Sequence, residues 1–72
     1  MRLFDLIVNL RDEVIAFDAE LASKLSTALD LLHADDWIGC RILLELIAKR
    51  GDDDVKYLLS PITTAARNYL LV

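Results

Sequence analysis

The residues best suited to chemistry lie in one stretch, His33 to Cys40, which reads HADDWIGC. It contains the only histidine, tryptophan and cysteine of the chain, with two aspartates between them. Imidazole, thiolate and carboxylate groups are the ligands that zinc prefers. Zinc sites commonly combine two close-spaced ligand pairs, whereas this stretch has a single histidine and a single cysteine. We therefore expect no metal and no cofactor here.

A cysteine–histidine nucleophilic pair needs hydrogen-bond contact and a third group that orients the base. His33 ends one predicted helix, where the helix dipole favours its cationic form, and Cys40 lies in the first turns of the next. Asp35 or Asp36 suits the N-cap of that second helix. We therefore interpret the stretch as a joint between helices with a buried thiol, and we expect no catalytic residue and no enzyme activity.

The run Asp52-Asp53-Asp54 invites a calcium interpretation. An EF-hand loop needs alternating ligands, a central glycine and a terminal glutamate, and none of these follows. The run instead predicts a solvated turn and a helix cap.

Composition predicts one small domain, residues 1–72, that does not bury all of its apolar residues alone. Hydrophobic residues make up 56% of the 72, which exceeds the usual share, while a chain this short has much surface for its interior. This surplus favours a homodimer or a constitutive protein partner. The net charge of −4 disfavours direct binding to nucleic acid.

The lone cysteine and the absence of a long apolar segment indicate a cytoplasmic protein without a membrane partner. One cysteine excludes an intrachain disulfide and fits a reducing compartment. The longest stretch without a charged side chain, Tyr57 to Ala66, falls far short of the ~20 residues of a spanning helix. The first residues show no signal-peptide pattern.

Apolar residues recur at helical spacing along the first 33 residues, which contain no glycine or proline. The stripe stays in phase, so we expect one helix over residues 3–33, about 45 Å long. Asp18 offers an alternative, because an aspartate there can cap a second helix and bend the element. The stripe is formed by Leu3, Ile7, Leu10, Val14, Phe17 and Leu21, and it resumes at Leu25, Ala28 and Leu32.

A second helix is predicted from Asp35 or Asp36 to Arg50, with Gly51 as its stop residue. Its polar positions Arg41, Glu45 and Lys49 fall on one narrow strip, and most of the remaining circumference is apolar. Such a helix is expected to be central and to be the most buried element. Ser60-Pro61 then predicts a broken C-terminal helix that restarts at the proline. The fold class is therefore an all-α bundle of three to five helices.

The central helix spans about 22 Å, half the length of an unbroken first helix. Either the first helix bends near Asp18 and the bundle is compact, or its excess length pairs with a second copy. The second option also uses the apolar surplus, and it favours a homodimer.

The segment LRDEVIAFDAELASKL, Leu10 to Leu25, resembles the first helix of the all-helical chorismate mutases. That resemblance implies a dimer built on a long first helix, with Arg11 contacting a substrate carboxylate. The second arginine of that family would fall near Ala28 and is missing, as is the downstream lysine and arginine–glutamate signature.

The sequence thus favours a small acidic protein–protein interaction module, a regulator or adaptor that acts through apolar helix faces. An alternative is an acidic inhibitor that mimics nucleic acid and occupies a basic partner, with carboxylates at Asp35–Asp36 and Asp52–Asp54 forming two poles. A helix-turn-helix DNA reader is disfavoured because its recognition helix would need more cations. The expected interaction residues are Trp37, Leu3, Ile7, Leu10, Val14, Phe17, Leu21 and Tyr69.

Overall fold

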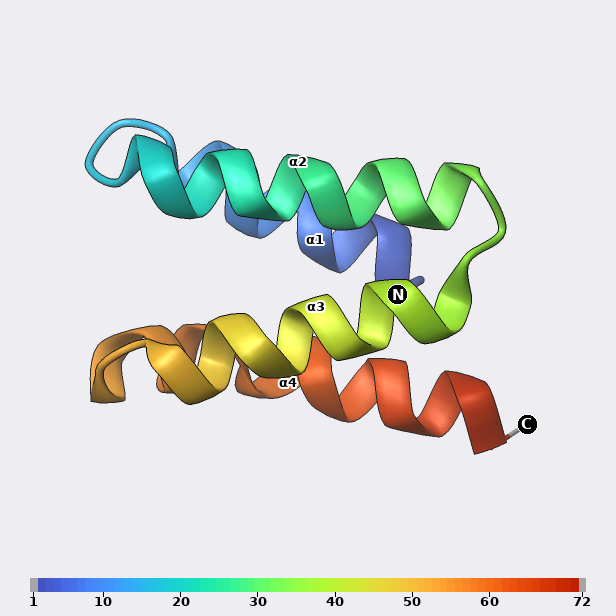
Figure 1. The fold of residues 1–72 in the computed structure, drawn as a ribbon. Coiled ribbons are helices and arrows are strands. Elements are labelled where there is room, and N and C mark those ends of the chain that lie inside the picture. Colours follow the sequence, from blue (N-terminus) through green and yellow to red (C-terminus); the bar gives the residue numbers. More distant parts are fainter. Residues whose placement is uncertain (1, 72) are drawn as a thin grey trace.

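Four helices connected by short turns form the fold (Figure 1). The computed structural model describes residues 2–71, with side chains described through residue 68. In chain order the helices are α1 (Leu3–Val14), α2 (Ala19–His33), α3 (Trp37–Arg50) and α4 (Asp53–Leu71). The described residues form no strand, so the prediction of an all-α bundle of three to five helices is confirmed.

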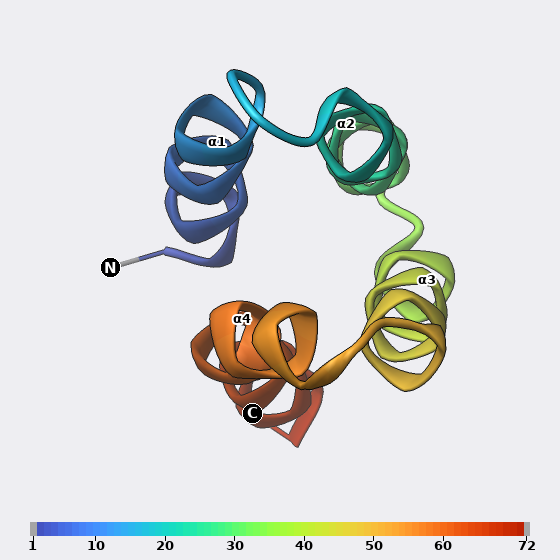
Figure 2. The same ribbon diagram turned by 90° about the vertical axis from the view of Figure 1, so that its left-hand side faces the viewer.

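The helices are arranged as a ring around one core (Figure 2). Each packs beside its two neighbours, and the ring closes through a contact between α1 and α4. The extents of 33 × 22 × 21 Å match helices of 12 to 19 residues lying side by side.

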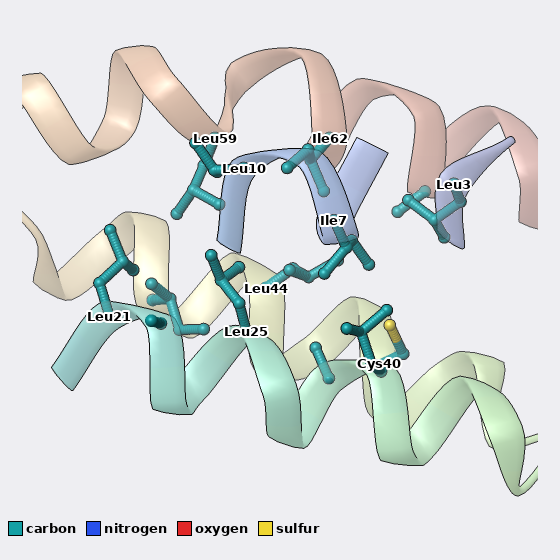
Figure 3. Close-up of a cluster of buried hydrophobic side chains, with 14 of the residues drawn as sticks. Leu3, Ile7, Leu10, Leu21, Leu25, Cys40, Leu44, Leu59 and Ile62 are labelled. Atoms are coloured by element: carbon teal, nitrogen blue, oxygen red, sulfur yellow. The ribbon is translucent and has the colours of Figure 1, made fainter. Parts of the chain in front are cut away.

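The core is entirely apolar and draws on every helix (Figure 3). Ile7, Leu25, Leu44 and Leu59, one from each helix, are completely buried at its centre. No charged or polar side chain is buried among the described residues. The remaining core positions are Leu3, Leu10, Val14, Leu21, Ala22, Ala28, Leu29, Cys40, Ile47, Ile62 and Ala66.

The prediction of one helix over residues 3–33 is wrong, and the alternative break at Asp18 is correct. The Asp18 carboxylate accepts a hydrogen bond from the Leu21 N–H at 3.0 Å and begins α2. The chain folds back in the turn before it, so α1 and α2 lie antiparallel and direct both halves of the stripe into one core. Phe17 falls in this turn and is 72% exposed, although its spacing matched the stripe.

Asp36 and not Asp35 caps α3, because its carboxylate accepts the Gly39 N–H at 2.9 Å. Asp35 instead terminates α2 in the left-handed region, with φ of 60°, which aspartate tolerates better than most residues. The N–H groups of Asp35 and Asp36 donate to the carbonyls of Leu32 and Leu31, as in a Schellman motif. The predicted stop at Gly51 is confirmed.

The expectation that α3 is the most buried element is wrong. Only Cys40, Leu44 and Ile47 are buried on it, whereas five residues of α2 are. In a ring of four helices each helix has two neighbours and one solvent-facing side, so an apolar circumference cannot be covered completely.

The C-terminal helix is continuous and not broken at Ser60-Pro61. Pro61 lies on the exposed side of α4, between the buried Leu59 and Ile62. A proline here removes one hydrogen bond, to the carbonyl of Tyr57, whose residue is also exposed, so water can replace the lost donor. The Thr63 hydroxyl donates to the neighbouring carbonyl of Ser60 at 3.1 Å.

Candidate interaction surface

An apolar stripe faces solvent along α3. Ile38, Ile42 and Leu46 follow one another at intervals of four, within about 80° of arc at 100° per residue. Their exposed fractions are 66%, 52% and 41%. The opposite side of the same helix carries Cys40, Leu44 and Ile47 into the core. We call the three exposed residues the outer stripe. α3 therefore has two apolar faces, and the fold uses one of them.

Sequence reasoning missed the outer stripe because it assigned these residues to a central helix that was expected to be the most buried element. The signal was present, since apolar residues on opposite sides of a helix indicate two contact surfaces as well as burial. Which of the two holds depends on how many neighbours surround the helix. The number of neighbours is a tertiary property that periodicity along a single helix does not encode.

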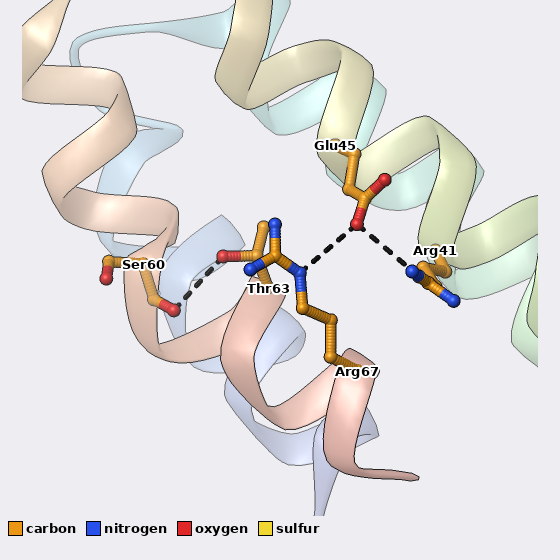
Figure 4. A network of polar contacts seen from close by, with 5 residues as sticks. All are labelled: Arg41, Glu45, Ser60, Thr63 and Arg67. Atoms are coloured by element: carbon orange, nitrogen blue, oxygen red, sulfur yellow. Dashed lines mark hydrogen bonds and ion pairs between the residues drawn. The ribbon is translucent and has the colours of Figure 1, made fainter. Parts of the chain in front are cut away.

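A charged network borders the outer stripe (Figure 4). Glu45 Oε1 accepts hydrogen bonds from the Nε atoms of Arg67 on α4, at 3.3 Å, and of Arg41 on α3, at 3.4 Å. The bond from Arg67 and then that from Arg41 lower the pKa of Glu45 below its ordinary value of 4.5. The network ties α3 to α4 at the surface and places a carboxylate and two guanidinium groups beside the stripe.

Most of the expected interaction residues lie inside the core of their own chain. Those residues pack from α1 and α2 against the other helices, so their side chains are already occupied within one protein molecule. They are Leu3, Ile7, Leu10, Val14 and Leu21.

The remaining three expected residues lie elsewhere. Phe17 is exposed in the turn before α2, next to Ile15, which is 59% exposed. Trp37 is half-buried at the start of α3 and lines a hollow at the end of the bundle. Tyr69 falls outside the described side chains.

The stretch from His33 to Cys40 is a joint, as its pattern predicted. His33 ends α2, where its ring meets Phe4 edge to face with centroids 5.1 Å apart. Cys40 is completely buried, and that burial, with a smaller effect from the charge of Asp36, raises the pKa of its thiol to about 11. A thiol with so high a pKa carries almost no thiolate near neutral pH, so Cys40 is a poor nucleophile. Among the described residues, no three metal-ligating side chains lie together.

The acidic turns form two separate poles, at opposite ends of α3. In each turn one carboxylate is engaged as a helix cap: Asp36 accepts the Gly39 N–H, and Asp52 accepts the Val55 N–H at 3.0 Å. Asp36 and Asp52 therefore stabilise the starts of α3 and α4.

The architecture differs from that implied by the chorismate mutase resemblance. The first helix ends at Val14 and has no excess length to share with a second copy. Arg11 lies at the surface, where its nearest acidic partner is its neighbour Asp12 at 3.5 Å.

Comparison with known proteins gives no family assignment. No protein-family model matches the chain, and neither a curated protein nor a solved structure matches it. Within residues 2–71, no helix combines the length and apolar character that a membrane span requires.

Proposed function

We propose that this chain is a protein–protein interaction module that acts through the outer stripe of α3, and that a second copy of the chain occupies the stripe. The observation that carries the proposal is the position of Ile38, Ile42 and Leu46 on the solvent-facing side of a helix whose other side already completes the core. Exposed apolar surface of this kind is stabilised when a partner covers it.

A second copy is favoured because the stripe and its border are complementary to themselves. In an antiparallel pairing of two α3 helices centred on Ile42, Ile38 of one copy faces Leu46 of the other. The same pairing brings Arg41 of one copy beside Glu45 of the other. Both intrachain bonds of Glu45 are made by Oε1, so Oε2 is the oxygen that would accept a guanidinium from the second copy.

The interface is expected to be small. A stable interface buries about 800 Å² on each partner, a sixth of the 4829 Å² surface of the described chain. One helix face about 21 Å long supplies less than that, so the dimer should belong to the weak class. Because each copy carries a net charge of −4, added salt should strengthen the pairing by screening repulsion.

The test is oligomeric state by analytical ultracentrifugation over a wide concentration range, with two matched variants. Ile42→Gln removes the centre of the stripe, and Ile15→Gln makes the same change at a residue of similar exposure in the α1–α2 turn. Since each substitution acts twice in a symmetric dimer, Ile42→Gln should raise the dimer Kd about ten- to a hundredfold. Ile15→Gln should leave it unchanged.

A wild-type chain that stays monomeric at every concentration, or an equal response of the two variants, would overturn the proposal. Dimerisation that weakens steeply with salt would also contradict it, because charge attraction and not apolar contact would then hold the copies together.

A further inference from the structure

A hollow of about 400 Å³ opens at the end of the bundle where α1 begins, α2 ends and α3 begins. Its size lies within the range of small-molecule sites. Six residues line it, five from the ends of these helices and one, Arg2, just before α1: Arg2, Leu3, Phe4, Leu32, His33 and Trp37.

Aromatic and aliphatic groups form the walls of this hollow. Phe4 and His33 hold each other edge to face, with an angle of 78° between their rings, and Trp37 is a third aromatic wall. Leu3 is nearly completely buried, so it joins the hollow to the core. A planar apolar group fits such walls, because aromatic rings stack favourably against one another.

The hollow contains one permanent cation. Arg2 is always cationic and offers five N–H groups in a planar fork that matches a carboxylate. No carboxylate belongs to the six lining residues, although the chain carries twelve. The two other hollows described on the surface include Glu45 in one, and Asp18 with Glu20 in the other. Of these three hollows, the one at Trp37 alone combines aromatic walls with a cation and has no carboxylate among its described lining residues.

The backbone around the hollow adds no charge preference of its own. α1 and α3 begin at this end of the bundle while α2 and α4 end there, so positive and negative ends of helix dipoles both lie at it (Figure 1). The carboxylate of Asp36, in the α2–α3 joint, accepts a hydrogen bond from the Gly39 N–H. The side chain of Arg2 makes no capping bond to α1 and pairs with no described carboxylate.

We propose that this hollow binds a small aromatic carboxylate, with its ring between Phe4 and Trp37 and its carboxylate on Arg2. The site is separate from the outer stripe, and it stands whether or not the chain dimerises. A ligand of about ten non-hydrogen atoms should bind with a high-micromolar to millimolar Kd.

Trp37 makes the test direct, because it is the only tryptophan of the chain and it lines the hollow. Phenylacetate is titrated while tryptophan emission is followed, and phenylacetamide is the neutral probe of the same shape. We expect a saturable change with phenylacetate and at least tenfold weaker binding of phenylacetamide. Chemical-shift changes at Leu32 and His33 in NMR spectra should locate the ligand in the hollow.

Two arginine variants complete the experiment. Arg2→Gln should weaken phenylacetate binding at least tenfold, and the exposed Arg2 side chain makes no capping hydrogen bond to α1. Arg67→Gln, which removes a cation from a different hollow, should leave binding unchanged. Equal affinity for the acid and the amide, an equal effect of the two variants, or no saturable change would overturn the proposal.

Discussion

Helices α2 and α3 are neighbours of nearly equal length. They share the same kind of N-cap and an apolar face toward the core, but they differ on the side that faces water. Each begins at an aspartate whose carboxylate accepts the N–H three residues later, and each presents a row of apolar residues to the core. The outer side of α2 is polar, whereas the outer side of α3 carries Ile38, Ile42 and Leu46. The exposed residues of α2 include Glu20, Ser23, Lys24, Thr27 and Asp30.

The contrast between these outer sides distinguishes the apolar residues that the fold needs from those that it does not need. In a ring of four helices, each helix needs one apolar face to pack against the core, and α2 has only that one. The second apolar face of α3 adds nothing to the core, and exposing it to water is unfavourable. Its presence supports the proposal that α3 contacts a second copy.

The largest expected effect tests the similarity of the inner faces. Leu25→Ala on α2 and Leu44→Ala on α3 each remove a completely buried side chain and leave a cavity. Each should lower the free energy of unfolding by about 2–5 kcal/mol. Urea denaturation at low protein concentration measures this. If Leu44→Ala cost far less than Leu25→Ala, α3 would be a peripheral helix and the comparison would fail.

The second prediction concerns the two caps. Asp18→Ala and Asp36→Ala should each cost about 1 kcal/mol of stability, since each removes the acceptor of a helix N–H. Thermal denaturation of both variants measures the loss. Similar losses of stability would show that the two caps are equivalent. An unchanged stability of Asp36→Ala would show that the α2–α3 joint positions α3 without the Asp36 cap.

Gly39 makes the cap of α3 distinguishable from that of α2, where Leu21 holds the equivalent position. A Cβ atom on Gly39 would collide with the Asp36 carboxylate. Gly39→Ala should therefore fail to give the roughly 1 kcal/mol that alanine gains over glycine in a helix. In the Asp36→Ala background that gain should appear. A full gain in the wild-type background would contradict the steric conflict.

Smaller effects are expected on the outer faces. At low concentration Ile42→Gln and Ser23→Gln should each change monomer stability by no more than about 0.5 kcal/mol, because both side chains are exposed. At high concentration the wild-type and Ser23→Gln chains should gain Tm through dimerisation, and Ile42→Gln should not. Calorimetry at two concentrations distinguishes these cases. A Tm of Ile42→Gln that rises as much as that of wild type would remove the functional difference between the two faces.

The smallest effect belongs to the network that borders the outer stripe. The depressed pKa of Glu45 means that its ionised form is favoured in the folded chain. Its contribution to stability is therefore present above the unfolded pKa, near 4.5, and is lost as pH falls through the lower folded value. NMR titration of the carboxylate should show a larger rise in the pKa of Glu45 for Arg67→Gln than for Arg41→Gln, since Arg67 makes the larger contribution. The reverse order would place the main contact on α3 itself.

Local patterns in the sequence predicted the helical class, the start of α3 at one of two aspartates and its stop at Gly51. Each of these depends on residues within one or two turns of one another. The break at Asp18 was visible only as an alternative, because Val14, Phe17 and Leu21 keep helical phase across a turn. At Pro61 the sequence predicted a break that the structure does not have, since a single lost hydrogen bond on the solvated side does not end a helix.

The candidate interaction surface was the least predictable feature. Apolar residues at helical spacing identify a face that is stabilised by burial. Whether its own chain or another molecule buries that face depends on how the helices pack together. The residues of α1 and α2 that looked available are covered within the bundle, and the residues of α3 that looked covered are available. The hollow at Trp37 also has no pattern in the chain, because its walls come from the ends of three helices.

The closed ring of helices has a consequence for how fast the chain folds. Three of its four helix contacts join elements adjacent in sequence, and only the contact between α1 and α4 joins distant ones. Local contacts close short loops and form rapidly, so this chain should refold in microseconds to milliseconds. Docking of α4 onto α1 closes the longest loop and is therefore expected to come last. The hairpin of α1 and α2 can form before it.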